Sequence, residues 1–125
     1  MTTYEVITNN PLVKEKFAQT CSLRYEELPT LELFQLVRDL IQKGHKLLTH
    51  PLAGSVKPNE TPYRSIMISK ERGAKVDPES ELIMEECIIA AKKFPPKGIK
   101  WPQRVIEDFQ YIDYTLISNV LSVHG

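Results

Sequence analysis

The stretch YEVITNNP, residues 4–11, sets the fold because it changes from strand to helix within a few residues. Its first five residues are mostly β-branched or aromatic, which is typical of a short strand. Asn9 and Asn10 then stop the strand, and either of them can cap a helix. Pro11 suits the first helical position. We therefore predict a strand that leads directly into a helix over 11–19.

The alternation continues through the first half of the chain. Residues 23–28 are a second strand candidate, and a helix capped by Thr30 carries apolar residues at helical spacing. Gly44 is placed to end this helix in a left-handed conformation, and 45–49 is predicted as a third strand. Because strands alternate with helices, we predict an α/β fold with a largely parallel sheet.

The second half adds a strand and two helices. Residues 64–69 predict a fourth strand, joined to the third by a long loop, which favours antiparallel pairing at a sheet edge; a parallel crossover is the alternative. Asp77 and Pro78 begin one helix, and another is predicted over 102–122. The expected architecture is one α/β domain over 1–125. It has a small three-layer sheet of about four strands, mostly parallel, with helices packed on it.

The last predicted helix carries more apolar residues than one contact needs. One face is lined by Val105, Phe109, Ile112, Leu116 and Val120, and the stripe is widened by Ile106, Ile117 and Leu121. Deep burial and a homodimer surface explain this excess equally well.

Composition argues against several classes of protein. Sixteen Lys and Arg balance sixteen Asp and Glu, so the chain lacks the basic excess of a general nucleic-acid or acidic-membrane binder, although a local basic patch is compatible with this balance. Cys21 and Cys87 lie far apart, and the histidines have no ligand spacing, so no metal site is predicted. No glycine-rich phosphate motif occurs, and no cofactor is expected. Without a visible signal peptide or spanning apolar run, a cytoplasmic location is expected.

Two segments fall where a site is expected. Ligands of open α/β sheets bind outside the carboxyl ends of parallel strands, and residues 8–10 and 49–50 lie there if the first and third strands are neighbours. A helix N-terminus in this place favours an anion or a polar metabolite. The candidate ligand-binding residues are Thr8, Asn9, Asn10, Thr49, His50, Ser55, Lys57, Asn59, Glu60, Tyr63 and Arg64. Helix capping by the asparagines alone is the competing interpretation.

The segment from His50 to Arg64 has no periodicity and holds three prolines. Long irregular loops in small domains are uncommon and usually serve a function, so a stiff polar loop of this kind indicates recognition. The competing interpretation is a solvated surface loop. His50 is either a general base or a loop residue that makes hydrogen bonds, and the lack of a nucleophile motif such as G-x-S-x-G favours the second role.

Two stretches resemble a known family. ITNNPLV at 7–13 and KGHKLLTHPLAGSVKPNETPYRS at 43–65 are similar to the GrdX family, and the resemblance is weakest after Asp77. Members of that family are encoded with the glycine, sarcosine and betaine reductase systems of amino-acid-fermenting anaerobes. The resemblance implies a cytosolic accessory protein, and it supplies no catalytic residues.

These observations lead to one main hypothesis and two alternatives. The main one is a non-catalytic accessory or regulatory protein that binds a small anionic metabolite or a reductase-complex protein through the loop 50–64. The first alternative is a small enzyme for an anionic metabolite, with His50 as acid–base and Thr8, Asn9, Lys57 and Arg64 as binding residues. The second is an assembly factor that dimerises through the last helix.

Overall fold

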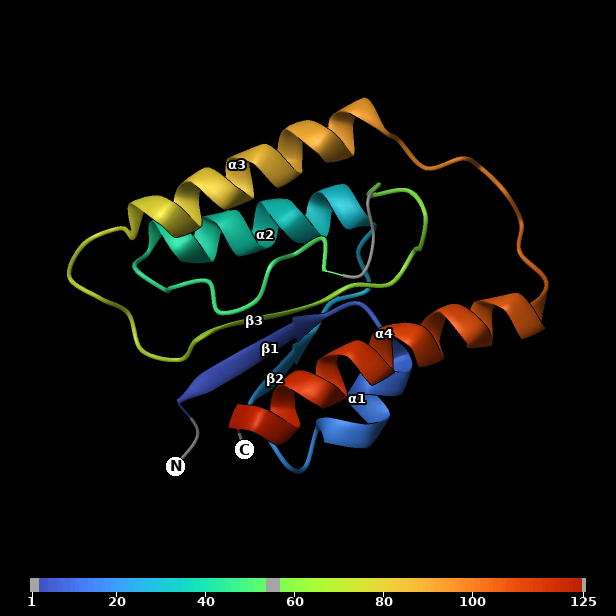
Figure 1. Ribbon diagram of the computed structural model, residues 1–125, viewed down its shortest axis with the longest axis horizontal. Coiled ribbons are helices and arrows are strands. Elements are labelled where there is room, and N and C mark those ends of the chain that lie inside the picture. Colours follow the sequence, from blue (N-terminus) through green and yellow to red (C-terminus); the bar gives the residue numbers. More distant parts are fainter. Residues whose placement is uncertain (1–2, 54–56, 125) are drawn as a thin grey trace.

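A three-stranded mixed sheet lies at the centre of the computed structural model, which describes residues 3–53 and 57–124 (Figure 1). The strands are β1 (Tyr4–Thr8), β2 (Leu23–Tyr25) and β3 (Ser65–Ser69), in the order β2-β1-β3. β1 is parallel to β2 and antiparallel to β3. The predicted α/β class is therefore confirmed.

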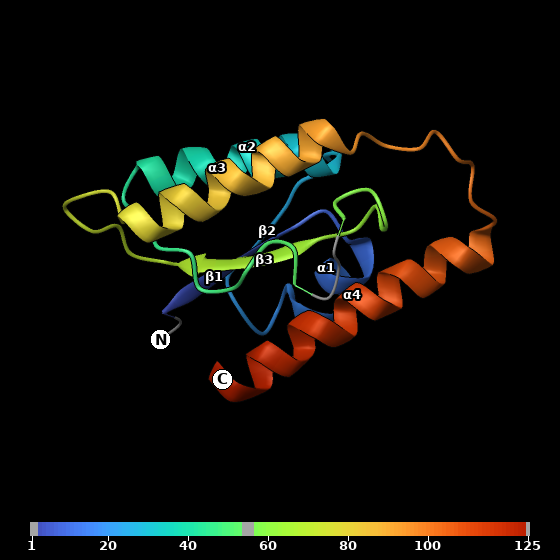
Figure 2. The same cartoon turned by 45° about the horizontal axis from the view of Figure 1, so that its top comes forward.

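Four helices cover the two faces of this sheet. They are α1 (Pro11–Phe17), α2 (Thr30–Gln42), α3 (Pro78–Lys93) and α4 (Gln103–His124). Figures 1 and 2 show α2 and α3 together on one side, with α1 and α4 on the other. Each face has its own core because strand side chains alternate. Ile7, Ile66 and Ile68 pack with α2 and α3, while Val6 and Met67 pack with α1 and α4.

The helix termini follow local chemistry. The Asn10 side chain accepts a hydrogen bond from the Leu12 N–H at 3.0 Å, and Asp77 accepts one from the Ser80 N–H at 3.1 Å. Both of these predicted N-caps are confirmed, each with a proline in the first turn. Thr30 lies inside α2 instead, and Pro29 occupies the cap without a side-chain hydrogen bond. The first turn of α2 thus begins without a capping oxygen from its own side chains.

The predicted strand over 45–49 is wrong, and a sheet of about four mostly parallel strands is not formed. Only Leu47 bridges β3, antiparallel to Ile68, which is the direction favoured from the sequence. Hydroxyl groups occupy backbone donors along this edge. The Leu47 N–H donates to Ser80 Oγ at 2.9 Å, and the Met67 N–H donates to Thr49 Oγ1 at 2.9 Å. Two backbone hydrogen bonds flank this bridge, from the Leu48 N–H to the Met67 carbonyl and from the Ser69 N–H to the Lys46 carbonyl, each 2.8 Å long. The hydroxyl acceptors on the neighbouring donors limit the ladder to this one bridge.

The apolar stripe of α4 is rotated from its predicted position. Ile117 and Leu121 enter the core beside Val6 and Met67. Ile112 and Leu116 are instead 57% and 39% exposed. The homodimer that this stripe suggested stays a prediction. Among the described helices, α4 included, none is both long and apolar enough to span a membrane.

Candidate functional site

The end of β1 carries a cluster of polar side chains, called here the polar cluster, in which all but the half-buried Ser65 are buried: Thr8, Asn9, Asn10, Arg64, Ser65 and Asp113. Residues 8–10 meet the end of the long loop, whereas the sequence placed them beside its start at 49–50. They meet because β1 and β3 are antiparallel, which places Thr8 opposite Ser65. The predicted strand over 45–49 has no part in this juxtaposition.

Asp113 of α4 ties the polar cluster together. Its Oδ2 accepts hydrogen bonds from Asn10 Nδ2 at 3.0 Å and from Ser65 Oγ at 2.7 Å. Asn10 also donates to the Gln110 carbonyl at 2.9 Å, so one asparagine caps α1 and holds α4. Burial raises the pKa of the Asp113 carboxyl, and these hydrogen bonds and the Arg64 charge oppose the shift.

Asn9 braces the loop rather than facing solvent. Its Nδ2 donates to the Leu28 carbonyl at 2.8 Å and to the Pro62 carbonyl at 2.9 Å. Its Oδ1 accepts the Arg64 N–H at 2.8 Å. Both amide hydrogens and the oxygen are therefore engaged, and Asn9 fixes the positions of β3 and of the loop that precedes it.

Arg64 is an almost fully buried guanidinium, only 3% exposed. Its Nη2 donates to the Lys57 carbonyl at 3.2 Å and lies 3.4 Å from the Pro58 carbonyl, while its Nε is buried without a partner among the described residues. Burial lowers the pKa of this guanidinium, and the nearby Asp113 charge works against that shift. The buried Arg64 side chain thus joins the start of β3 to the loop backbone at Lys57 and Pro58.

A small cavity of about 30 Å³ lies beside this arginine. Its lining includes Thr49, His50, Arg64, Ser65 and Asp113. A space of this size accommodates a water molecule but no metabolite. The exposed His50 accepts the Leu52 N–H at its Nδ1, at 3.1 Å, so one ring nitrogen is used within the loop.

The remaining predicted residues lie elsewhere on the loop. Tyr63 accepts a hydrogen bond at its hydroxyl from Gln110 Nε2, at 3.0 Å. Lys57 places its ammonium 5.6 Å from the centroid of the Phe94 ring. Asn59 and Glu60 line a second, much larger pocket. Ser55 lies outside the described residues.

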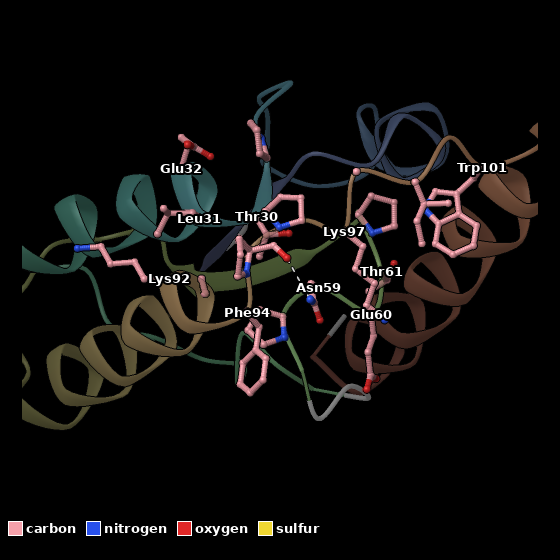
Figure 3. Close-up of a pocket in the computed structure, with 18 residues that line it drawn as sticks. Thr30, Leu31, Glu32, Asn59, Glu60, Thr61, Lys92, Phe94, Lys97 and Trp101 are labelled. Carbon is pink, nitrogen blue, oxygen red and sulfur yellow. Dashed lines mark hydrogen bonds between the residues drawn. The ribbon is translucent and has the colours of Figure 1, made fainter.

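That larger space, called here the loop pocket, has a volume of about 630 Å³ (Figure 3). It lies between the loop 58–62, the start of α2, the end of α3 and the segment that leads to α4. Its walls are mainly apolar, from Leu31, Ala91, Phe94, Ile99, Trp101 and five prolines. The volume is in the range of pockets that hold small ligands or the side chains of a partner.

Polar atoms supply the smaller part of the surface of the loop pocket. Figure 3 places Asn59 near its middle, where the Asn59 Nδ2 donates to the Pro95 carbonyl at 3.0 Å. The Asn59 Oδ1 is buried and has no donor among the described residues. Glu32 and Lys92 point away from the centre, and Trp101 stands at the opposite end from Leu31. The pocket therefore suits an apolar group that brings at least one hydrogen-bond donor.

Sequence reasoning missed Asp113 and the loop pocket. Asp113 lies four and eight residues before Ile117 and Leu121, so a carboxylate at core spacing was the available signal. The pocket had no local signal, because its walls come from three separate parts of the chain.

A scan against protein families matched residues 5–122 to the model described as GrdX-like protein. No curated protein and no solved structure gave a significant match. The matched range includes β2, β3, all of β1 except Tyr4, the polar cluster and every residue that lines the loop pocket. Since the match spans nearly the whole sequence, the chain belongs to the GrdX-like protein family.

Proposed function

We propose that this protein is a non-catalytic accessory protein of the glycine, sarcosine and betaine reductase system, and that it acts by binding a partner at the loop pocket. Membership of the GrdX-like family supports the link to that system. The observation that carries the binding role is the apolar pocket of about 630 Å³, which includes residues 58–62 of the long loop. A concave, mostly apolar pocket is the usual form of a binding site.

The character of the walls favours a partner over a free metabolite. Glycine, sarcosine and betaine are small and charged, and they would leave most of this volume unfilled. Covering the proline, leucine, isoleucine and aromatic walls with apolar surface favours binding by about 25 cal/mol per Å² of apolar surface buried. An apolar side chain on a partner protein supplies that surface.

The enzyme alternative finds less support. The residues it assigns to substrate binding do not converge: Thr8 and Asn9 are buried and hydrogen-bonded within the polar cluster, and Lys57 is exposed beside Phe94. His50 borders a cavity of only about 30 Å³. We therefore assign the polar cluster a structural role, which is to fix the loop that forms the pocket.

A pocket-filling variant tests the proposal. Thr61 lines the loop pocket and is half-buried, so Thr61→Phe would occupy part of its volume with little effect on the core. In an anaerobe whose reductase operon has lost this gene, glycine-dependent reductase activity should fall and return with the wild-type gene. Complementation with Thr61→Phe should restore less than about a tenth of the reductase activity that the wild-type gene restores.

Thr20→Phe is the matched control. Thr20 is exposed in the turn after α1, away from the pocket. Its hydroxyl donates to the Phe17 carbonyl at 3.3 Å, and Thr61 Oγ1 likewise makes one local hydrogen bond, from the Tyr63 N–H at 3.3 Å. This variant should complement fully. Full complementation by Thr61→Phe, with both proteins folded by circular dichroism, would refute a role for the pocket. An unchanged activity after gene loss would refute the accessory role itself.

A further inference from the structure

One stretch beside the loop pocket concentrates positive charge. Residues 92–104, called here the basic strap, contain five Lys or Arg residues and no Asp or Glu. Because the whole chain is neutral, the remaining residues carry a net charge of −5. All five cationic side chains of the strap are exposed. They are Lys92, Lys93, Lys97, Lys100 and Arg104.

The basic strap forms one wall of the pocket. Figures 1 and 2 show its orange segment between the end of α3 and the start of α4, standing at the edge of the molecule. Apolar residues alternate with the charges along it: Ile99 is 49% exposed and Trp101 37% exposed, and both line the pocket. A partner in the pocket would meet apolar surface and cationic side chains together.

A sixth cation faces the strap from the loop. The ammonium groups of Lys57 and Lys93 lie 5.6 and 5.7 Å from the centroid of the Phe94 ring. Two ammonium groups near one ring raise the electrostatic free energy of this region, and the negative face of the ring offsets part of that rise. An anionic group on a partner would relieve this repulsion when it binds.

We propose that the loop pocket and the basic strap together bind an acidic peptide segment of a partner protein, with an apolar side chain in the pocket and carboxylates on the strap. This inference rests on the proposed function and specifies its partner. Charge complementarity is its main support, and it also accelerates association at low ionic strength. The buried Asn59 Oδ1 adds a second reason, because the backbone N–H of an inserted peptide supplies the donor that it lacks.

A peptide fits better than a nucleic acid. Glu32 and Glu60 border the same pocket, so a chain with a phosphate at every unit would bring negative charge against them. A peptide places its carboxylates only where the strap is. The Trp101 ring already packs edge-on against Phe109, with centroids 5.2 Å apart, which leaves it less suited to stacking on successive bases.

The chain carries its own probe, because Trp101 is the single tryptophan and lines the pocket. The full chain is titrated, with Trp101 emission as the readout, against a pool of tryptophan-free peptides that alternate Asp or Glu with Leu, Ile or Phe. A second pool carries Asn and Gln in place of the acids, and a third probe is oligo(dT). We expect saturable binding of the acidic pool, about tenfold tighter than that of the amide pool and weaker in high salt.

Two variants and a matched control separate the contribution of the strap charges to peptide binding from that of the pocket. Neutralising the strap with Lys97→Gln, Lys100→Gln and Arg104→Gln should weaken binding of the acidic pool about tenfold. The same change at the exposed Lys16, Lys43 and Lys75, outside the strap, should leave it unaltered. Thr61→Phe should abolish it. No emission change with the acidic pool, equal binding of the amide pool, or tighter binding of oligo(dT) would each overturn the proposal.

These results stay distinguishable from failure of the proposed function. If Thr61→Phe fails to complement while the acidic and amide pools bind alike, the pocket serves the reductase system with a partner of another charge. If Thr61→Phe complements fully, the accessory role of the pocket is refuted, whatever the peptides show.

Discussion

At the scale of single residues, Asp113 is the group on which most of the polar cluster depends. It is 7% exposed and accepts hydrogen bonds from Asn10 and Ser65, which lie on different elements. A carboxylate in this position is costly to bury, and the donors around it offset part of that cost. Its ionisation is therefore linked to folding.

The pH dependence of stability should report this linkage. The Asp113 pKa is raised above its ordinary value of 3.8, so the folded chain holds this proton more tightly than the unfolded chain does. The resulting stabilisation is complete below 3.8 and is lost as pH rises through the folded pKa. The free energy of unfolding of the wild type, minus that of Asp113→Asn, should therefore fall as pH rises. Urea denaturation of both proteins at a series of pH values measures this difference in the free energy of unfolding. A difference that rises with pH would contradict the prediction.

At the scale of the elements, the turn after α2 is fixed by close backbone contact. Gly44 has a φ of +108°, and a Cβ there would lie 2.5 Å from the carbonyl oxygen of Gly73. The Gly73 N–H in turn donates to the Gly44 carbonyl at 2.8 Å. The turn is thus joined to the segment that leads from β3 to α3, and both strain and a clash oppose any side chain at Gly44.

Gly44→Ala should lower the free energy of unfolding by about 3 kcal/mol, because the alanine adds a backbone clash to the left-handed strain. Gly98 is the matched control: its φ is +69°, but a Cβ there meets nothing within 4 Å. Gly98→Ala should therefore cost only about 1 kcal/mol, from the backbone conformation alone. Chemical denaturation compares the two, and equal losses would show that the contact with Gly73 adds nothing.

At the scale of the whole molecule, one strand serves two cores. Met67 and Ile68 are neighbours in β3, both are fully buried, and they face opposite sides of the sheet. Ile68 packs in the core with α2 and α3, and Met67 packs in the core with α1 and α4. Loss of packing on either side is therefore transmitted through the same strand.

Met67→Ala and Ile68→Ala should each lower the free energy of unfolding by about 2–5 kcal/mol, through lost burial and a new cavity. If the chain is one domain, as predicted, each variant should still unfold in a single transition. Far-ultraviolet circular dichroism and aromatic fluorescence should then give the same denaturation midpoint. Midpoints that separate in either variant would show that the two layers of helices unfold independently.

The sequence by itself determined those features that depend on near neighbours in the chain. Caps at Asn10 and Asp77, the end of α2 near Gly44 and the α/β class all follow from short-range hydrogen bonding, backbone sterics and periodicity. The family resemblance was equally local, because it rests on two continuous stretches. The sequence also placed residues 8–10 beside the long loop, but at its start; Asn9 instead contacts its end, because β1 pairs with β3.

Only the tertiary structure decided what depends on partners far away in sequence. Residues 45–49 have strand composition, yet their pairing with β3 stops at one bridge, because hydroxyl groups such as Ser80 Oγ accept neighbouring backbone N–H groups. Asp113 joins the polar cluster because α4 packs across β1 and β3, and the loop pocket exists because the basic strap returns past the loop 58–62. The irregular stretch at 50–64 was recognised as important from its composition. The role we propose for it rests on the way Arg64 and Asn9 fix residues 57–64 beside an apolar pocket. Long-range packing decides this, because it determines which polar groups are hydrogen-bonded inside the protein and which surface stays exposed.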